Sequence, residues 1–128
     1  PAAPDLLEWY KKLDIEIFQG YGMTEDGCVS HFNRPNENKI GTVGKPVPGI
    51  ETKLSEAGEI LIKNECLMSG YFKNPEATSA VFDSEGFLRT GDQGEYDHDG
   101  YLTITGRIKG KFKTDKGKYI SPSSYKLQ

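Results

Sequence analysis

Near the start of the chain, apolar residues recur at the spacing of one helical face. Leu6, Trp9 and Leu13 lie three and four positions apart, so all three project from the same side of an α-helix. An acidic residue, Asp5, precedes them where a helix favours negative charge. The pattern predicts a short helix over residues 4–13.

A second short helix is predicted over residues 75–81. Asn74 is suited to cap it by accepting a hydrogen bond from the first turn, and Pro75 suits the first helical position, where no N–H is needed. In the preceding segment, we expect Gly70-Tyr71 to form a turn and Phe72 to lie in the core. We expect no catalytic role for this stretch.

Most of the remaining chain consists of short apolar runs separated by glycine, proline and acidic residues, which is typical of β-strands joined by turns. Strands are expected at residues 15–18, 50–54, 59–63, 94–97 and 101–105. The last two strands should form a tight hairpin with a bulge. The predicted fold class is α+β and mainly β, a small distorted β-barrel or bent sheet with two short helices.

The composition narrows the class of protein. With 128 residues, of which 35% are hydrophobic and 27% charged, the chain is one domain or part of one. Two cysteines, Cys28 and Cys66, do not make a disulfide framework, and such thiols are usually small buried hydrophobic residues. We therefore expect a reducing compartment, the cytoplasm, with at most a peripheral contact to a membrane.

The charge is unevenly distributed. Residues 107–118 contain six basic side chains and one acidic one, although the whole chain has a net charge of −3. A basic run of this kind can bind nucleic acid, but runs of this size are usually solvated surface. The overall acidity argues against nucleic acid as the principal partner.

A first group of candidate functional residues follows the strand predicted at residues 15–18. Tyr21-Gly22-Met23-Thr24-Glu25 offers an aromatic face, a flexible backbone, a hydroxyl and a carboxylate. These groups could stack on a base, bond a phosphate oxygen and supply an oxygen ligand to Mg²⁺. The plainer interpretation is an ordinary strand exit with Tyr21 in the core.

A second group lies further along the chain. Thr90-Gly91-Asp92 places a carboxylate at a glycine turn, where it could accept hydrogen bonds from the vicinal hydroxyls of a ribose. Arg107 ends the predicted hairpin, where its guanidinium could reach the same sugar or a phosphate. The alternatives are a plain turn aspartate and a surface arginine. His31 and His98 are interpreted as exposed turn residues and not as metal ligands.

Four segments, in this order, together resemble the adenylate-forming superfamily of acyl-CoA synthetases, peptide-synthetase adenylation domains and luciferases. They are YGMTE (21–25), GEILIKNECLMSGYFKNPEAT (58–78), LRTGD (88–92) and GRIKGKFKTDKGKYISP (106–122). The form KTDKGKYISP is most similar to the version in long-chain fatty acid–CoA ligases. The resemblance covers nearly the whole chain.

The resemblance implies roles for individual residues. Tyr21, with Gly22 beside it, would lie against adenine, and the Thr24 hydroxyl would bond the α-phosphate. Glu25 would help to hold Mg²⁺, so Thr24 and Glu25 are the candidate catalytic residues. Asp92 would accept hydrogen bonds from the ribose hydroxyls, with Arg107 on the same sugar. Lys109 would be the hinge residue between the large domain and a small C-terminal lid.

The reaction implied has two steps, adenylation of a fatty acid by ATP with Mg²⁺ and transfer of the acyl group to coenzyme A. The partners implied are therefore small molecules. By this resemblance residues 1–106 are the C-terminal part of the AMP-binding large domain, and residues 107–128 are the hinge and the first residues toward the lid. Both ends are expected to be cut from a longer polypeptide, because the chain opens directly on a helix and stops shortly after a further element begins. The family's phosphate loop and lid lysine do not occur in this sequence, so the piece alone should be inactive.

Two alternatives stay open at the level of sequence. The parent enzyme could activate an aromatic, short-chain or amino acid instead of a fatty acid. The chain could also be a non-catalytic β-module that binds a nucleotide or a protein.

Overall fold

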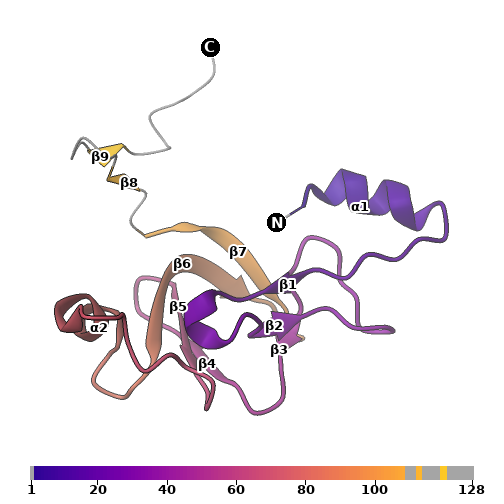
Figure 1. Ribbon diagram of the computed structural model, residues 1–128. Coiled ribbons are helices and arrows are strands. Elements are labelled where there is room, and N and C mark those ends of the chain that lie inside the picture. Colours follow the sequence, from indigo (N-terminus) through magenta and orange to yellow (C-terminus); the bar gives the residue numbers. More distant parts are fainter. Residues whose placement is uncertain (1, 109–111, 114–118, 121–128) are drawn as a thin grey trace.

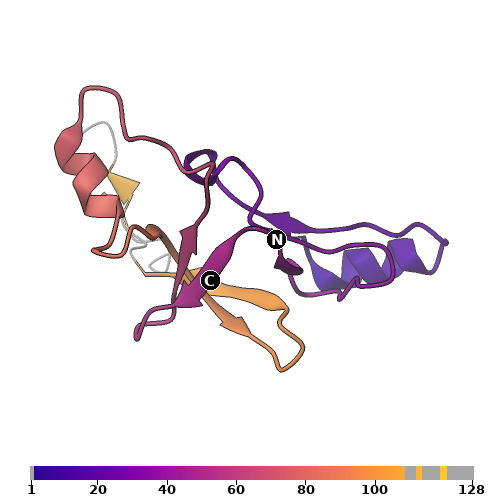
Figure 2. The same ribbon diagram turned by 90° about the horizontal axis from the view of Figure 1, so that it is seen from below.

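The computed structural model describes residues 2–108, 112–113 and 119–120 and contains two main β-sheets. One sheet has three very short strands in the order β1-β2-β3, and the other has four strands in the order β4-β5-β6-β7. Figures 1 and 2 show the two helices, α1 and α2, at opposite ends of the molecule with the sheets between them. A further pair, β8 (Phe112–Lys113) and β9 (Tyr119–Ile120), forms a separate two-stranded sheet.

All neighbouring strands of the larger sheet are antiparallel. The strands are β4 (Glu51–Leu54), β5 (Glu59–Lys63), β6 (Leu88–Tyr96) and β7 (Leu102–Arg107). This confirms four predicted strands, although β6 begins six residues earlier than expected. The register shift between Gln93 and Gly94 is the expected hairpin bulge, but it lies within β6 and not beside the turn. The sheet is open, as in the bent-sheet form of the predicted fold.

Both predicted helices are present. Helix α1 spans Pro4–Lys11 and helix α2 spans Pro75–Val81. The Asn74 side chain caps α2 by accepting a hydrogen bond from the backbone N–H of Ala77 at 3.0 Å, as the sequence predicted. Among the described residues, no helix is both long enough and apolar enough to cross a membrane.

The smaller sheet consists of β1 (Gly20–Tyr21), β2 (His31–Phe32) and β3 (Lys45–Pro46). The strand predicted at residues 15–18 is wrong, because this segment forms no strand in the structure. One of its carbonyls, that of Ile17, instead accepts a hydrogen bond from the Asn38 side chain at 3.2 Å. Alternating apolar residues alone therefore did not identify a strand here.

The core lies where the inner face of the larger sheet meets the segment that connects β2 to β3. Ile60, Ile62 and Leu102 are fully buried together with Val43, and Tyr21 packs against this cluster. Two backbone hydrogen bonds connect the two parts. Val43 N–H donates to Leu102 O at 2.8 Å, and Leu102 N–H donates to Gly44 O at 2.9 Å.

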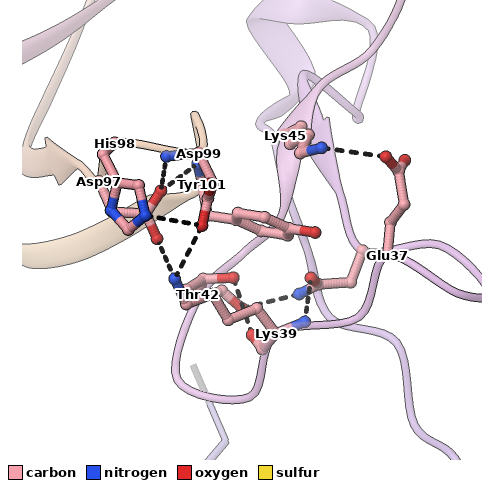
Figure 3. Close-up of polar contacts among 9 residues, drawn as sticks. Glu37, Lys39, Thr42, Lys45, Asp97, His98, Asp99 and Tyr101 are labelled. Atoms are coloured by element: carbon pink, nitrogen blue, oxygen red, sulfur yellow. Dashed lines mark hydrogen bonds and ion pairs between the residues drawn. The ribbon is translucent and has the colours of Figure 1, made fainter.

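A polar cluster secures the same connection at the hairpin between β6 and β7 (Figure 3). One oxygen of Asp97 accepts from the backbone N–H groups of Asp99 and Tyr101, and the other pairs with Lys39. The hydrogen bond from Lys39 and that from the Tyr101 backbone lower the pKa of Asp97 to about 2. Lys39 and Lys45 also lie over the Tyr101 ring.

Three burial predictions are wrong. Phe72, expected in the core, is 89% exposed, and Cys28 and Cys66 are exposed free thiols. His31, expected in an exposed turn, is fully buried in β2, whereas His98 is exposed as predicted. Burial depends on which elements meet in three dimensions, and these short segments gave no periodic signal of it.

Gly44 offers a direct test of this packing. A Cβ added there would lie 2.1 to 2.3 Å from backbone atoms of Phe32 and Asn33, and φ is +86°. We expect Gly44→Ala to destabilise the protein by about 3 kcal/mol or more, because both the left-handed backbone and the overlap with main chain oppose it. Urea unfolding would measure the change.

Gly41→Ala is the matched control, since Gly41 has φ of +89° but no atom within 4 Å of an added Cβ. It should cost only the backbone strain, about 1 kcal/mol. Equal losses for the two variants would contradict the packing described.

Candidate functional site

The proposed nucleotide residues Tyr21, Asp92 and Arg107 meet at the junction of the two sheets. The Tyr21 hydroxyl donates to Asp92 Oδ2 at 2.8 Å, and Arg107 Nε pairs with Asp92 Oδ1 at 2.8 Å. Asp92 and Arg107 are paired partners in β6 and β7, whereas Tyr21 comes from β1 in the other sheet. Three residues that are far apart in sequence are thus held around one carboxylate.

The carboxylate of Asp92 is nearly enclosed. Its side chain is 8% exposed, whereas that of Arg107 is 62% exposed. Each carboxylate oxygen has two lone pairs, so the Tyr21 and Arg107 bonds leave capacity for two more donors. Such a group can accept from two neighbouring hydroxyls, and the exposed guanidinium beside it can contact an anion.

Tyr21 itself is held in the neutral form. Burial raises the pKa of its phenol well above the usual value, and the nearby carboxylate of Asp92 acts in the same direction. The phenol therefore stays a hydrogen-bond donor to Asp92 throughout the physiological range. Its ring also packs against the core, as the plainer interpretation of Tyr21 expected.

The position of Asp92 corrects the sequence interpretation. Thr90-Gly91-Asp92 was expected at a turn, but it lies inside β6. Gly91 has a φ of +75°, and its N–H donates to Glu59 Oε1 at 3.0 Å, outside the regular ladder. A glycine with left-handed backbone inside a strand produces the same sequence signal as a turn.

Thr24 and Glu25 begin the 3₁₀ helix η1 (Thr24–Asp26), which follows β1 closely. Thr24 is exposed and Glu25 is half-buried. Gly22 is required for the tight return of the chain, because a Cβ there would lie 2.2 Å from the carbonyl oxygen of Cys28. Asp26 is buried and closes the turn by accepting from the N–H groups of Met23 and Cys28, each at 3.0 Å.

Sequence reasoning missed Tyr71. Its hydroxyl donates to Glu25 Oε1 at 2.9 Å, which connects the segment before α2 to the first group of candidate residues. The backbone N–H of Met68 also donates to Glu25 O at 2.9 Å. Tyr71 was assigned to a structural turn, and no local signal in the sequence pointed to a partner 46 residues away.

The described residues suit a metal ion only if a bound nucleotide supplies further ligands. Among the described residues, no group of three or more His, Cys, Asp or Glu side chains could hold a metal ion. Mg²⁺ commonly keeps several waters and takes one or two carboxylates together with substrate phosphates. The half-buried carboxylate of Glu25 therefore fits an ion that arrives with a nucleotide. Lys109, the predicted hinge residue, and most of the basic run at 107–118 lie outside the described residues.

The AMP-binding enzyme family matches residues 1–72, and the chain belongs to this family. It is 39% identical over 96% of its length to the long-chain-fatty-acid–CoA ligase FadD15 of Mycobacterium tuberculosis. It is 34% identical over 95% of its length to the peroxisomal long chain acyl-CoA synthetase 7 of Arabidopsis thaliana. The chain spans about a fifth of the length of each of these relatives.

Solved structures agree with this assignment. O-succinylbenzoate coenzyme A synthetase (MenE) from Bacillus subtilis, in complex with ATP and magnesium ion, superposes with a TM-score of 0.77 at 32% identity. The match covers 96% of this chain and 28% of that one. The anthranilate CoA ligase AuaEII, in complex with anthranoyl-AMP, gives a TM-score of 0.76 at 30% identity, covering 94% of this chain and 25% of that one. The mainly β architecture is thus that of part of an adenylate-forming CoA ligase.

The contact between Tyr21 and Asp92 can be tested without any ligand. Tyr21→Phe should lower the free energy of unfolding by about 1–2 kcal/mol, because it leaves a nearly enclosed carboxylate oxygen without its donor. Tyr71→Phe is the matched control, since it removes the same kind of bond from an exposed site and should cost less than about 0.5 kcal/mol. Urea unfolding would measure the loss of unfolding free energy in both variants. Equal losses would mean that the enclosed Tyr21 bond stabilises the protein no more than the exposed Tyr71 bond.

Proposed function

We propose that this chain is part of an ATP-dependent fatty acid–CoA ligase, which activates a fatty acid as its acyl-adenylate and transfers the acyl group to coenzyme A. The observation that carries the proposal is the convergence of Tyr21 and Arg107 on the enclosed carboxylate of Asp92, in a chain of the AMP-binding family. The fatty acid is favoured over other acids by the two relatives described above, both named as long-chain enzymes.

In this proposal each site residue acts on the nucleotide. Tyr21 lies against adenine, Asp92 accepts from the ribose hydroxyls, and Arg107 contacts the sugar or a phosphate. The Thr24 hydroxyl bonds the α-phosphate, and Glu25, held by Tyr71, would hold Mg²⁺ through a carboxylate oxygen or by accepting a hydrogen bond from a water on the ion. Mg²⁺ bound with ATP neutralises phosphate charge.

The chemistry needs orientation more than a base. A carboxylate is already ionised at neutral pH and attacks the α-phosphorus of ATP directly, displacing pyrophosphate, so the protein must align it and stabilise charge on the phosphate. The thiol of coenzyme A then attacks the acyl carbonyl, and AMP leaves. Thr24 and Glu25 lie in one turn of η1, which allows both to face the same phosphate.

The domain assignment is also a proposal. We assign residues 1–106 to the C-terminal part of an AMP-binding large domain and residues 107–128 to the hinge and the approach to a lid. Support comes from α1, whose apolar residues Leu6 and Trp9 are 50% and 54% exposed. Relatives about five times as long have further polypeptide that could cover such a surface. The exposed free thiols favour a reducing compartment, and we propose the cytoplasm.

The direct test is ATP–pyrophosphate exchange by the complete enzyme that contains this chain, over a panel of carboxylic acids. Exchange should be fastest with long-chain fatty acids. A preference for an aromatic acid is the second candidate, favoured by the structural similarity to the anthranilate ligase. Absence of exchange with every acid, while nucleotide still binds, would favour a non-catalytic module.

Asp92→Ala in that enzyme should raise the KM for ATP by about tenfold to a hundredfold and leave the KM for the acid nearly unchanged, because the carboxylate serves two ribose hydroxyls. Steady-state kinetics would measure both constants. Asp99→Ala is the control, since Asp99 lies in the exposed hairpin turn. An unchanged KM for ATP in Asp92→Ala would remove Asp92 from the ribose site.

Lys109 is proposed as the pivot of lid rotation. Rotation requires φ and ψ to change at one or two residues, and proline fixes φ near −65°. Lys109→Pro should therefore retain pyrophosphate exchange while acyl-CoA formation falls by orders of magnitude. Lys109→Ala, which leaves the torsions free, should keep both rates within about tenfold. Normal acyl-CoA formation by Lys109→Pro would contradict this role.

A further inference from the structure

The buried histidine of β2 lies directly across from Tyr21. His31 and Tyr21 are paired residues of β1 and β2, and each also bonds to β6. The Tyr21 hydroxyl bonds Asp92 at 2.8 Å, and His31 Nε2 bonds the Tyr96 hydroxyl at 2.7 Å. The smaller sheet is thus attached to the strand that carries Asp92 at two points, one of which is an imidazole with 0% exposure.

Hydrogen bonds continue from His31 in both directions. The Ser30 hydroxyl lies 3.0 Å from Nδ1 and donates to the backbone carbonyl of Tyr21 at 3.2 Å. On the other side, the Tyr96 hydroxyl lies 2.7 Å from the hydroxyl of Thr52 in β4. A connected chain of hydrogen bonds therefore runs from the main chain of Tyr21, through the imidazole and Tyr96, to Thr52 in β4, an edge strand of the larger sheet.

The directions of these bonds depend on which imidazole nitrogen carries the proton. When the single hydroxyl proton of Ser30 goes to Tyr21, Nδ1–H donates to Ser30 and, in the neutral ring, Nε2 accepts from Tyr96. When Ser30 instead donates to Nδ1, Nε2–H donates to Tyr96. In both cases both nitrogens are bonded and the imidazole connects Ser30 to Tyr96.

Burial of the ring favours the neutral imidazole. Burial lowers the pKa of His31 to about 4. The titratable groups facing the ring are the phenols of Tyr21 and Tyr96, with ring centroids 6.0 and 5.8 Å away; Ser30 and Thr52 are uncharged. Asp92 is reached only through Tyr21, so no carboxylate bonds the imidazole directly among the described residues.

We propose that His31 is a positioning residue of the nucleotide site: its buried imidazole, bonded to Tyr96, connects β2 to β6 and thereby holds the Tyr21 phenol on Asp92. Nδ1 bonds the adjacent residue Ser30, whereas Nε2 bonds Tyr96 in β6, so the imidazole connects β2 to the strand that carries Asp92. The role in nucleotide binding rests on the proposed function, whereas the hold on Tyr21 does not.

The experiment compares three variants of the complete enzyme. His31→Phe fills the site but removes both hydrogen bonds, and Tyr96→Phe removes only the hydroxyl that bonds Nε2 and keeps the ring. His98→Phe is the matched control, because that imidazole is 86% exposed. Circular dichroism and thermal unfolding would establish that each variant folds.

Two readouts separate the parts of the proposal. NMR titration of the Tyr21 ring should show its pKa falling toward the ordinary value in both His31→Phe and Tyr96→Phe, because the phenol becomes less buried and leaves Asp92. The same two variants should raise the KM for ATP by about tenfold with little change in kcat. His98→Phe should change neither, and the ¹⁵N shifts of the wild-type His31 imidazole should report the neutral form from pH 5 to 8, because burial lowers its pKa to about 4.

Folded variants with an unchanged Tyr21 titration would overturn the proposal. A shifted Tyr21 titration in an enzyme that performs no pyrophosphate exchange would retain the hold on Tyr21 and reject the proposed function. If His31→Phe does not fold, Tyr96→Phe decides the outcome by the same two readouts.

Discussion

Attachment of the small β1-β2-β3 sheet to strand β6 is the constraint on which the candidate site depends. Tyr21 reaches Asp92 across 71 positions of sequence, and His31 reaches Tyr96 across 65. Each of the three strands of the small sheet has only two residues, so its own ladder is too short to hold it in place. The buried polar contacts and the backbone bonds around Leu102 do so instead.

Polar contacts of this kind specify one arrangement more strictly than apolar packing does. Leaving an enclosed hydroxyl or carboxylate without its partner costs about 1–3 kcal/mol of stability. Sliding the small sheet by one residue would break several such bonds together and is therefore strongly disfavoured. The enclosed carboxylate of Asp92 is thereby preorganised, with two donors in place and lone pairs left over. Preorganised acceptors bind hydroxyl groups well because little ordering is left to occur on binding.

Local signals in the sequence predicted the elements that depend on local physics. Helix α2 has a capping asparagine followed by proline, and β5 is an apolar run between polar ends, and both were predicted residue for residue. The strand expected at 15–18 failed because its backbone found a side-chain partner, Asn38, in place of a ladder. Thr90-Gly91-Asp92 was placed in a turn because a glycine inside a strand bulge gives the same signal.

The sequence identified three residues that the structure brings together, but not the contacts that hold them. Tyr21, Asp92 and Arg107 were chosen from short motifs, and the structure brings them together. Tyr71 and His31 were missed or misjudged, since each acts through a partner at least 46 positions away that no spacing rule reveals. Long-range pairing decides such contacts, and single-sequence patterns carry little information on it.

The most direct test of the account is a crystal structure of the complete enzyme with AMP. The account predicts both ribose hydroxyls within hydrogen-bond distance of the Asp92 carboxylate, adenine against the Tyr21 ring, and the Tyr21–Asp92 bond intact. AMP bound elsewhere, or a ribose that makes no contact with Asp92, would contradict it.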